Sequence, residues 1–123
     1  FSCIIKSMAE FKPFTIERPW GNFRQLTHNS LSTVKVHRVK PGEETSWQSH
    51  AKRSEFWHII GGDGRILIGD KEYNIIPGAE YDVPVGVKHR WIAGSSGIIL
   101  VEVAAGDFDE EDIIRYEDKY GRA

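Results

Sequence analysis

Turn signals that contain glycine or proline recur along this chain at short, fairly regular spacing, which strongly limits what it can fold into. The segments between the turns are short and rich in β-branched and aromatic residues, which favours strands over helices. Gly69-Asp70 is a hairpin signal between two of these segments. Many short strands with such corners predict an all-β sandwich or barrel of the jelly-roll type. The expected strands cover residues 31–39, 45–52, 55–60, 65–68, 72–75, 81–83, 89–93 and 98–104.

Helical periodicity is weak until the C-terminal tail, where residues 110–119 could form one or two turns. Asp109 directly precedes this segment and is a suitable helix cap. We therefore expect a short C-terminal helical segment, with short extensions at both ends of the β-domain.

A length of 123 residues corresponds to one domain. We expect residues 1–7 to be a cloning or annotation remnant, because Met8 can serve as the first natural residue, and residues 8–123 to form a single domain. The net charge of -2 disfavours nucleic acid or an anionic membrane as the main partner. No run approaches the roughly 20 apolar residues that span a bilayer. The single cysteine, Cys3, fits a reducing compartment, so a cytoplasmic location is expected.

Two short polar clusters carry the candidate chemistry. In the first, Gln48, His50 and Lys52 share one face if the strand is regular, and a turn before Glu55 could re-aim that side chain. In the second, the corner at Gly86 would bring His89 back toward them. Imidazole nitrogen with carboxylate and amide oxygen suits a divalent metal ion such as Zn, Mn, Fe or Ni. The two clusters therefore predict one shared metal site, walled by Trp57 and Trp91.

The same clusters resemble the paired motifs of the cupin superfamily, which implies a double-stranded β-helix barrel. The second histidine of the first cupin motif is replaced by Lys52, and the terminal asparagine of the second motif by Ala93. The matching positions are Gly42, His50, Glu55 and Gly62 in the first motif, and Gly78, Pro84, Gly86 and His89 in the second.

A closer resemblance spans most of the chain, and it is to the cupin domain of type II mannose-6-phosphate isomerases. It is carried by the segments 17–21, 39–42, 48–50, 53–55 and 117–122, which occur in this order. In that family the cupin usually follows a guanylyltransferase domain, which has no counterpart here, so guanylyl transfer is not expected. The resemblance implies isomerisation of mannose 6-phosphate to fructose 6-phosphate through a metal-stabilised cis-enediol.

The resemblance also implies roles for particular residues. The metal ligands would be Gln48, His50, Glu55 and His89, and the ion Zn, Mn, Co, Ni or Fe. Catalytic proton transfer would fall to Lys52 or Arg53. The phosphorylated sugar would contact Lys35, Arg53, Trp57 and Trp91.

Two other functions stay open at this point. The first is a non-catalytic cupin that binds a sugar or sugar phosphate, which Lys52 and the missing partner domain favour. The second is an Fe(II) oxygenase built on His50, Glu55 and His89. The expected partner is a small-molecule sugar phosphate, with no nucleic acid and no membrane. A homodimer is expected because exposed sheet edges need covering.

Overall fold

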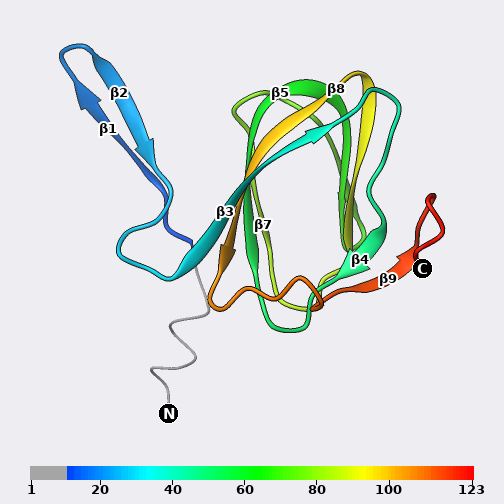
Figure 1. Ribbon diagram of the computed structural model, residues 1–123. Coiled ribbons are helices and arrows are strands. Elements are labelled where there is room, and N and C mark those ends of the chain that lie inside the picture. The colour runs from blue at the N-terminus through cyan, green and yellow to red at the C-terminus, as the bar shows by residue number, and fades with distance from the viewer. Residues whose placement is uncertain (1–10) are drawn as a thin grey trace.

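The computed structural model describes residues 11–123, so the prediction that residues 1–7 are a remnant lies outside the described range. Every regular element in this range is a β-strand, and the all-β prediction is confirmed (Figure 1). The strands are β1 (Phe14–Arg18), β2 (Gly21–Gln25), β3 (Ser32–Val39), β4 (Trp47–Ser49), β5 (Glu55–Ile68), β6 (Lys71–Asn74), β7 (Glu80–Val83), β8 (His89–Ala105) and β9 (Ile114–Glu117).

Two long, bent strands, β5 and β8, form the frame of the barrel. They pair with each other antiparallel along most of their length. The first half of β5 also pairs with β7 and its second half with β6, while β8 pairs with β4 near its start and with β3 near its end. Because each long strand has a different partner on each half, the sheet curls into a barrel (Figure 1).

Glycines let these long strands bend where the sequence predicted turns. The expected turn around Gly62 and Gly64 is instead a pair of irregularities inside β5, and the pairing with β8 continues beyond them. Both glycines have positive φ, 104° and 133°, which non-glycine residues rarely adopt. A Cβ on Gly62 would lie 2.0 Å from the carbonyl oxygen of Gly97, which belongs to the matching bend of β8. The four predicted short strands on either side of these bends are therefore two long ones. The Gly69-Asp70 hairpin, by contrast, is confirmed, because it joins β5 to β6.

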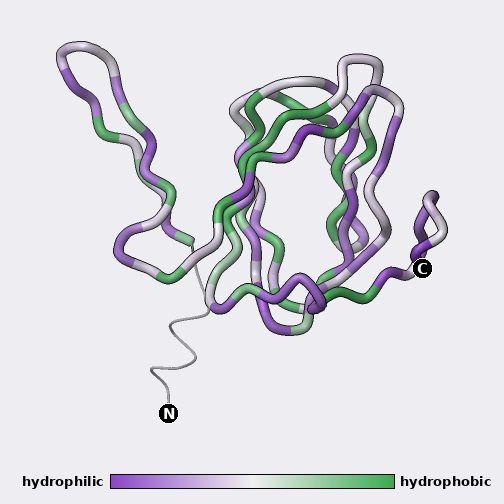
Figure 2. Tube along the Cα trace, viewed as in Figure 1, coloured by the Kyte–Doolittle hydropathy of each residue, from purple (hydrophilic) through white to green (hydrophobic). Residues whose placement is uncertain are grey.

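The core lies between the barrel strands. Hydrophobic stretches follow the barrel strands in Figure 2, whereas the C-terminal end is mostly hydrophilic. Within residues 11–123, no helix is long and apolar enough to cross a membrane. The buried core residues are Trp57, Ile59, Ile66, Ile75, Val83, Trp91, Ala93, Ile98 and Leu100.

An N-terminal hairpin, β1–β2, forms a separate two-stranded sheet that stands off the barrel (Figure 1). Its main link to the barrel is Arg24, whose guanidinium donates two hydrogen bonds of 2.7 Å to the carboxylate of Glu80 on β7. Nearby, the ring of Phe11 packs against Phe56 on β5 at 5.5 Å between centroids. These contacts hold the described part of the N-terminal extension against the barrel.

The predicted C-terminal helix is wrong. Asp109 does accept a hydrogen bond from the backbone N–H of Glu111, as a cap would, but only a single turn follows. The chain then extends into β9, which pairs with β4. Pairing with an available sheet edge outweighs the weak local preference for helix, because tertiary context overrides propensity in short segments.

Candidate metal centre

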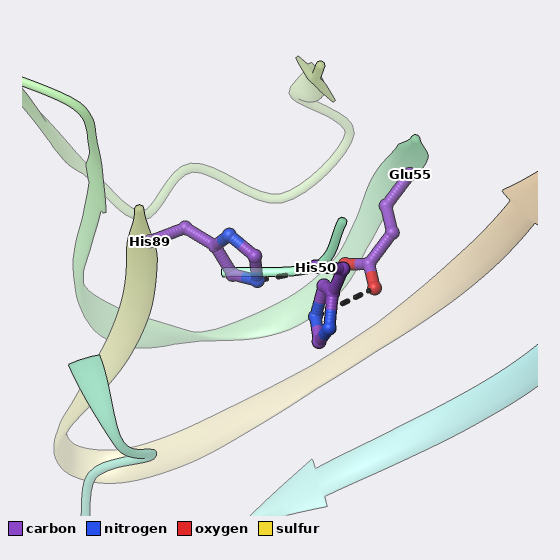
Figure 3. Close-up of side chains that lie close together, drawn as sticks. All are labelled: His50, Glu55 and His89. Carbon is purple, nitrogen blue, oxygen red and sulfur yellow. Dashed lines mark ion pairs between the residues drawn. The ribbon is translucent and has the colours of Figure 1, made fainter. Parts of the chain in front are cut away.

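Three buried side chains converge at one end of the barrel: His50, Glu55 and His89 (Figure 3). His50 follows the end of β4, while Glu55 and His89 begin β5 and β8. Each is at most 4% exposed, and their ligand atoms all lie within 4.8 Å of one another. One carboxylate oxygen of Glu55 lies 3.2 Å from Nε2 of His50, and the other lies 3.8 Å from Nε2 of His89. Separations of this size suit three ligands around one ion bound at about 2.0–2.2 Å.

Backbone carbonyls fix the orientation of both imidazoles. Nδ1 of His50 donates to the carbonyl oxygen of Asp112 at 2.7 Å, and Nδ1 of His89 donates to that of Val87 at 2.9 Å. A carbonyl oxygen can only accept, so the proton of each neutral ring lies on Nδ1 and the lone pair of Nε2 faces Glu55. A hydrogen bond on the other ring nitrogen is also how metal-binding histidines are usually held. The donor set therefore fits a divalent metal ion.

The protonation states of His89 and Glu55 agree with ligation. Burial lowers the pKa of His89, against the opposing attraction of Glu55, so the ring stays neutral. For Glu55, burial raises the pKa. The hydrogen bond from Glu102, the nearby histidines and the hydrogen bond from Arg53 outweigh burial, and the pKa falls well below its ordinary value. Neutral imidazole and ionised carboxylate are the forms that bind metals.

Arg53 lies within the ligand cluster and not at its edge. Its Nε donates to Glu55 at 2.9 Å and its Nη2 lies 3.2 Å from Nε2 of His50, while the side chain is only 8% exposed. The third nitrogen, Nη1, donates to the carbonyl oxygen of Asp109 at 3.2 Å. The predicted catalytic and phosphate-binding roles of Arg53 are untested, but its guanidinium directly contacts two of the candidate ligands.

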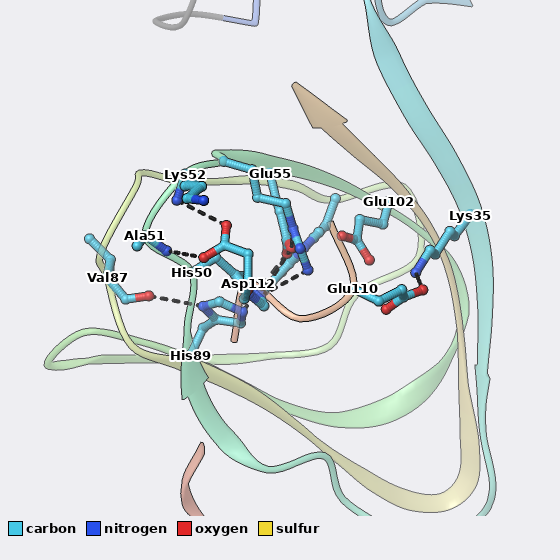
Figure 4. A network of polar contacts seen from close by, with 12 residues as sticks. Lys35, His50, Ala51, Lys52, Glu55, Val87, His89, Glu102, Glu110 and Asp112 are labelled. Carbon is cyan, nitrogen blue, oxygen red and sulfur yellow. Dashed lines mark hydrogen bonds and ion pairs between the residues drawn. The ribbon is translucent and has the colours of Figure 1, made fainter. Parts of the chain in front are cut away.

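The segment 106–113, here called the strap, connects β8 to β9 and passes beside the site (Figure 4). The carboxylate of Asp112 accepts hydrogen bonds from the backbone N–H groups of Ala51 and Lys52, at 2.8 and 2.9 Å. The backbone carbonyl of Asp112 accepts the bond from His50 described above. Asp112 therefore fixes both the ring of His50 and the loop that follows it. Because the sequence predicted a helix here, this role was missed.

Lys35 and Arg53 both contact an aromatic ring of the strap. The centroid of the Phe108 ring lies 4.3 Å from Nζ of Lys35 and 4.3 Å from the guanidinium carbon of Arg53. Glu110, also on the strap, forms an ion pair of 2.8 Å with Lys35. The structure thus brings the two predicted phosphate-binding cations together, with the strap against both.

Other predicted site residues lie at different distances from the cluster. Gln48 pairs directly opposite His89, so the two side chains share one face of the sheet, and its role as a ligand remains a prediction. The sequence predicted that Gln48, His50 and Lys52 share one face of a regular strand. This is wrong, because β4 ends at Ser49. Lys52 is exposed in the loop, with its backbone N–H held by Asp112.

The two tryptophans are buried more deeply than cavity walls would be. Trp57 is fully buried and donates its indole N–H to Glu55 at 3.0 Å. Trp91 is 6% exposed and meets Trp57 edge-on, at 5.1 Å between centroids. Their predicted contact with a sugar is untested. In the structure Trp57 holds Glu55, and Trp91 packs against Trp57 in the core.

Glu102 and His37 were missed from the sequence. Glu102 on β8 is 4% exposed and hydrogen-bonds both His37 on β3 and Glu55. Burial raises the pKa of Glu102. Its hydrogen bond to Glu55 requires a proton on one of the two carboxyl groups, and the raised pKa favours Glu102 as the donor. A lone glutamate inside the most apolar strand of the chain was the available signal.

A cleft of about 1000 Å³ lies outside the barrel, between the base of the N-terminal hairpin and the strap. Phe11, Phe14 and Leu31 line its apolar side, while Lys52 and Asp109 come from the loops that flank the site. The cleft therefore borders the ligand cluster without containing it.

An antiparallel barrel with two histidines and a glutamate converging at one end defines a cupin. The solved structure of oxalate decarboxylase from Bacillus subtilis shows this same fold, with a TM-score of 0.65 and 22% identity over 71% of this chain and 24% of that one. The chain belongs to the family described as "Mannose-6-phosphate isomerase C-terminal", whose model matches residues 7–118.

Two curated relatives share this domain. A mannose-1-phosphate guanylyltransferase of Salmonella montevideo is 38% identical over 109 residues, which are 87% of this chain and 23% of the relative. The xanthan biosynthesis protein XanB of Xanthomonas campestris is 35% identical, with the same coverage. The chain thus spans less than a quarter of the length of these relatives.

These names correct the functional prediction. The sequence resemblance implied a mannose-6-phosphate isomerase, whereas relatives that share the domain are named mannose-1-phosphate guanylyltransferase. The isomerase prediction is therefore wrong on this comparison. The prediction of a cupin stands, because the barrel and the motif histidines are present. The relatives are enzymes of sugar-phosphate metabolism.

Proposed function

We propose that this chain is a metal-binding cupin domain that binds a phosphorylated sugar at one end of its barrel. The observation that carries the proposal is the cluster of His50, Glu55 and His89, whose lone pairs face one another because backbone carbonyls hold the far side of each ring. The proposed role is ligand binding and includes no turnover.

The metal part of the proposal uses three or four protein ligands. His50, Glu55 and His89 would hold the ion. Gln48, which pairs opposite His89, would supply a fourth, neutral oxygen. A divalent ion bound there supplies a Lewis acid that attracts hydroxyl or carbonyl oxygens of a sugar. The buried Trp57 holds Glu55 in position for this role.

The phosphate part rests on the cations beside the cluster. Lys35 and Arg53 both approach Phe108, and Lys52 is exposed on the adjoining loop. Phosphate oxygens bind well to arginine forks and to lysine ammonium groups. The proposed substrate class is a sugar phosphate, and the names of the relatives point to mannose 1-phosphate as the first compound to test.

The test is calorimetric binding of mannose 1-phosphate in the presence and absence of Zn²⁺, with free mannose and inorganic phosphate as comparison ligands. The proposal expects mannose 1-phosphate to bind more tightly than either comparison ligand, and only with metal. His89→Ala should abolish both metal and sugar-phosphate binding. His58→Ala is the matched control, because His58 lies outside the barrel on the same strand as Glu55 and pairs with Glu80. Equal binding by wild type and His89→Ala would refute the proposal.

A further inference from the structure

The guanidinium of Arg53 contacts the same two atoms that a metal ion would use. Its Nε donates to Oε2 of Glu55 at 2.9 Å, and its Nη2 donates to Nε2 of His50 at 3.2 Å. The second contact has a defined direction, since the proton of His50 is on Nδ1, where it bonds to Asp112. Nε2 of His50 is therefore an acceptor, and Arg53 fills its lone pair.

A lone pair cannot serve an N–H donor and a metal ion at once. Binding a metal at His50 and Glu55 therefore requires Arg53 to release at least the bond to His50. Repulsion favours this release, because the guanidinium of Arg53 and a divalent ion bound to Glu55 would both be positive and close together. Metal and guanidinium are thus alternative cations for one buried carboxylate.

The same geometry explains how the cluster stays assembled without metal. Glu55 is 3% exposed and ionised, and a buried carboxylate without a cation is strongly unfavourable. Arg53 is the cation that directly hydrogen-bonds this carboxylate, and it is itself held by the carbonyl of Asp109 and the ring of Phe108. These last two contacts lie on the strap, away from the three ligands. Arg53 therefore has partners that it can keep when it leaves His50.

We propose that Arg53 is an internal cation that keeps the three-residue site assembled and sets its metal affinity by competing with the ion for His50 and Glu55. The inference rests on the proposed metal site. It adds a residue that determines how tightly that site holds metal, and it connects metal binding to the strap through Phe108 and Asp109.

The experiment measures Co²⁺ and Zn²⁺ binding by the metal-free protein and by Arg53→Gln. Removing one charge-assisted competitor is expected to raise metal affinity by about ten- to a hundred-fold. The metal-free variant is expected to melt at a lower temperature than wild type and to gain more from added Zn²⁺. Arg65→Gln is the matched control, because Arg65 is an exposed arginine on β5, away from the site, whose partner is Glu72. The metal affinity of this variant should equal that of wild type.

The outcomes separate this inference from the proposed function. Equal metal affinity in wild type and Arg53→Gln overturns the inference and leaves the metal site standing. Absence of metal binding in both proteins overturns both proposals. Metal binding by the variant alone supports the inference and makes Arg53 the resident cation.

A second measurement uses the wild-type protein and does not depend on the variant folding. The side-chain Nη2 signal of Arg53, which belongs to the nitrogen that donates to His50, can be followed by NMR as Zn²⁺ is added. We expect it to exchange slowly with solvent in the metal-free protein and to shift and lose protection when metal binds. An unchanged signal at saturating Zn²⁺ would show that the ion and Arg53 do not compete.

Discussion

Replacing Asp112 by alanine removes the side chain that joins the strap to the loop of the candidate site. The carboxylate accepts two backbone hydrogen bonds, from Ala51 at 2.8 Å and Lys52 at 2.9 Å. Bonds to a charged acceptor each contribute about 1.5–3 kcal/mol, but this carboxylate is half-buried, and solvent screening reduces that contribution. We therefore expect Asp112→Ala to lower the free energy of unfolding by roughly 2 kcal/mol, or about 8 °C in Tm for a chain of this length.

The same substitution should weaken metal binding more than its distance from the ion suggests. The carbonyl of Asp112 orients His50, and the carboxylate fixes the loop on which His50 lies. Loss of such outer contacts commonly costs ten- to a hundred-fold in metal affinity. Urea denaturation and Zn²⁺ calorimetry measure the two effects. Glu111→Ala is the control, since it removes an exposed carboxylate from the same strap.

The stability that the Asp112 carboxylate contributes should depend on pH. Burial raises the pKa of Asp112, but the hydrogen bonds from Ala51 and Lys52 outweigh it, and the pKa is lowered. Its stabilisation is therefore present at neutral pH and is lost as the pH falls from about 3.9 through the folded-state pKa. The stability gap between wild type and Asp112→Ala should close over this range. A gap of the same size at pH 7 and pH 2.5, or the same loss in Glu111→Ala, would refute the reasoning.

Three further predictions concern other parts of the barrel. Gly62→Ala should destabilise the protein by at least about 3 kcal/mol in urea denaturation, because its Cβ would lie 2.0 Å from the carbonyl oxygen of Gly97 and its φ is 104°. A loss below about 1 kcal/mol would contradict the close approach of β5 and β8 at this bend. Glu102→Gln should stay within about 1 kcal/mol of wild type at pH 7, since the carboxyl already donates a proton to Glu55, whereas a loss above 2 kcal/mol would show that Glu102 is ionised. The expected homodimer would form along β3, which pairs only with β8 among the described strands and carries Val36, 52% exposed. Light scattering should therefore show a dimer for wild type and a monomer for Val36→Lys. A monomeric wild type would refute the expected homodimer.

The convergence of His50, Glu55 and His89 could be predicted because local signals sufficed for it. The two cupin motifs matched in order and spacing. The structure then brought these residues together from three strand ends. What the sequence could not show was which groups would surround them.

Asp112 and Glu102 are the clearest cases of this limit. Asp112 lies just before β9, and the weak helical pattern of this region hid the pairing of β9 with β4. Glu102 has its partner His37 on β3, 65 residues away, and single-strand patterns carry no information about such distant pairs. The prediction of turns inside β5 and β8 was wrong for a related reason. Glycine clusters mark both turns and bulges, and only pairing with the neighbouring strand decides between them.

The measurement that tests the central claim most directly is anomalous X-ray scattering at the Zn edge from crystals of protein loaded with Zn²⁺. The account predicts one peak per chain, about 2.0–2.2 Å from Nε2 of His50, Nε2 of His89 and a carboxylate oxygen of Glu55, with the guanidinium of Arg53 displaced from His50. A peak elsewhere on the chain, or no peak while Arg53 still bridges His50 and Glu55, would contradict it.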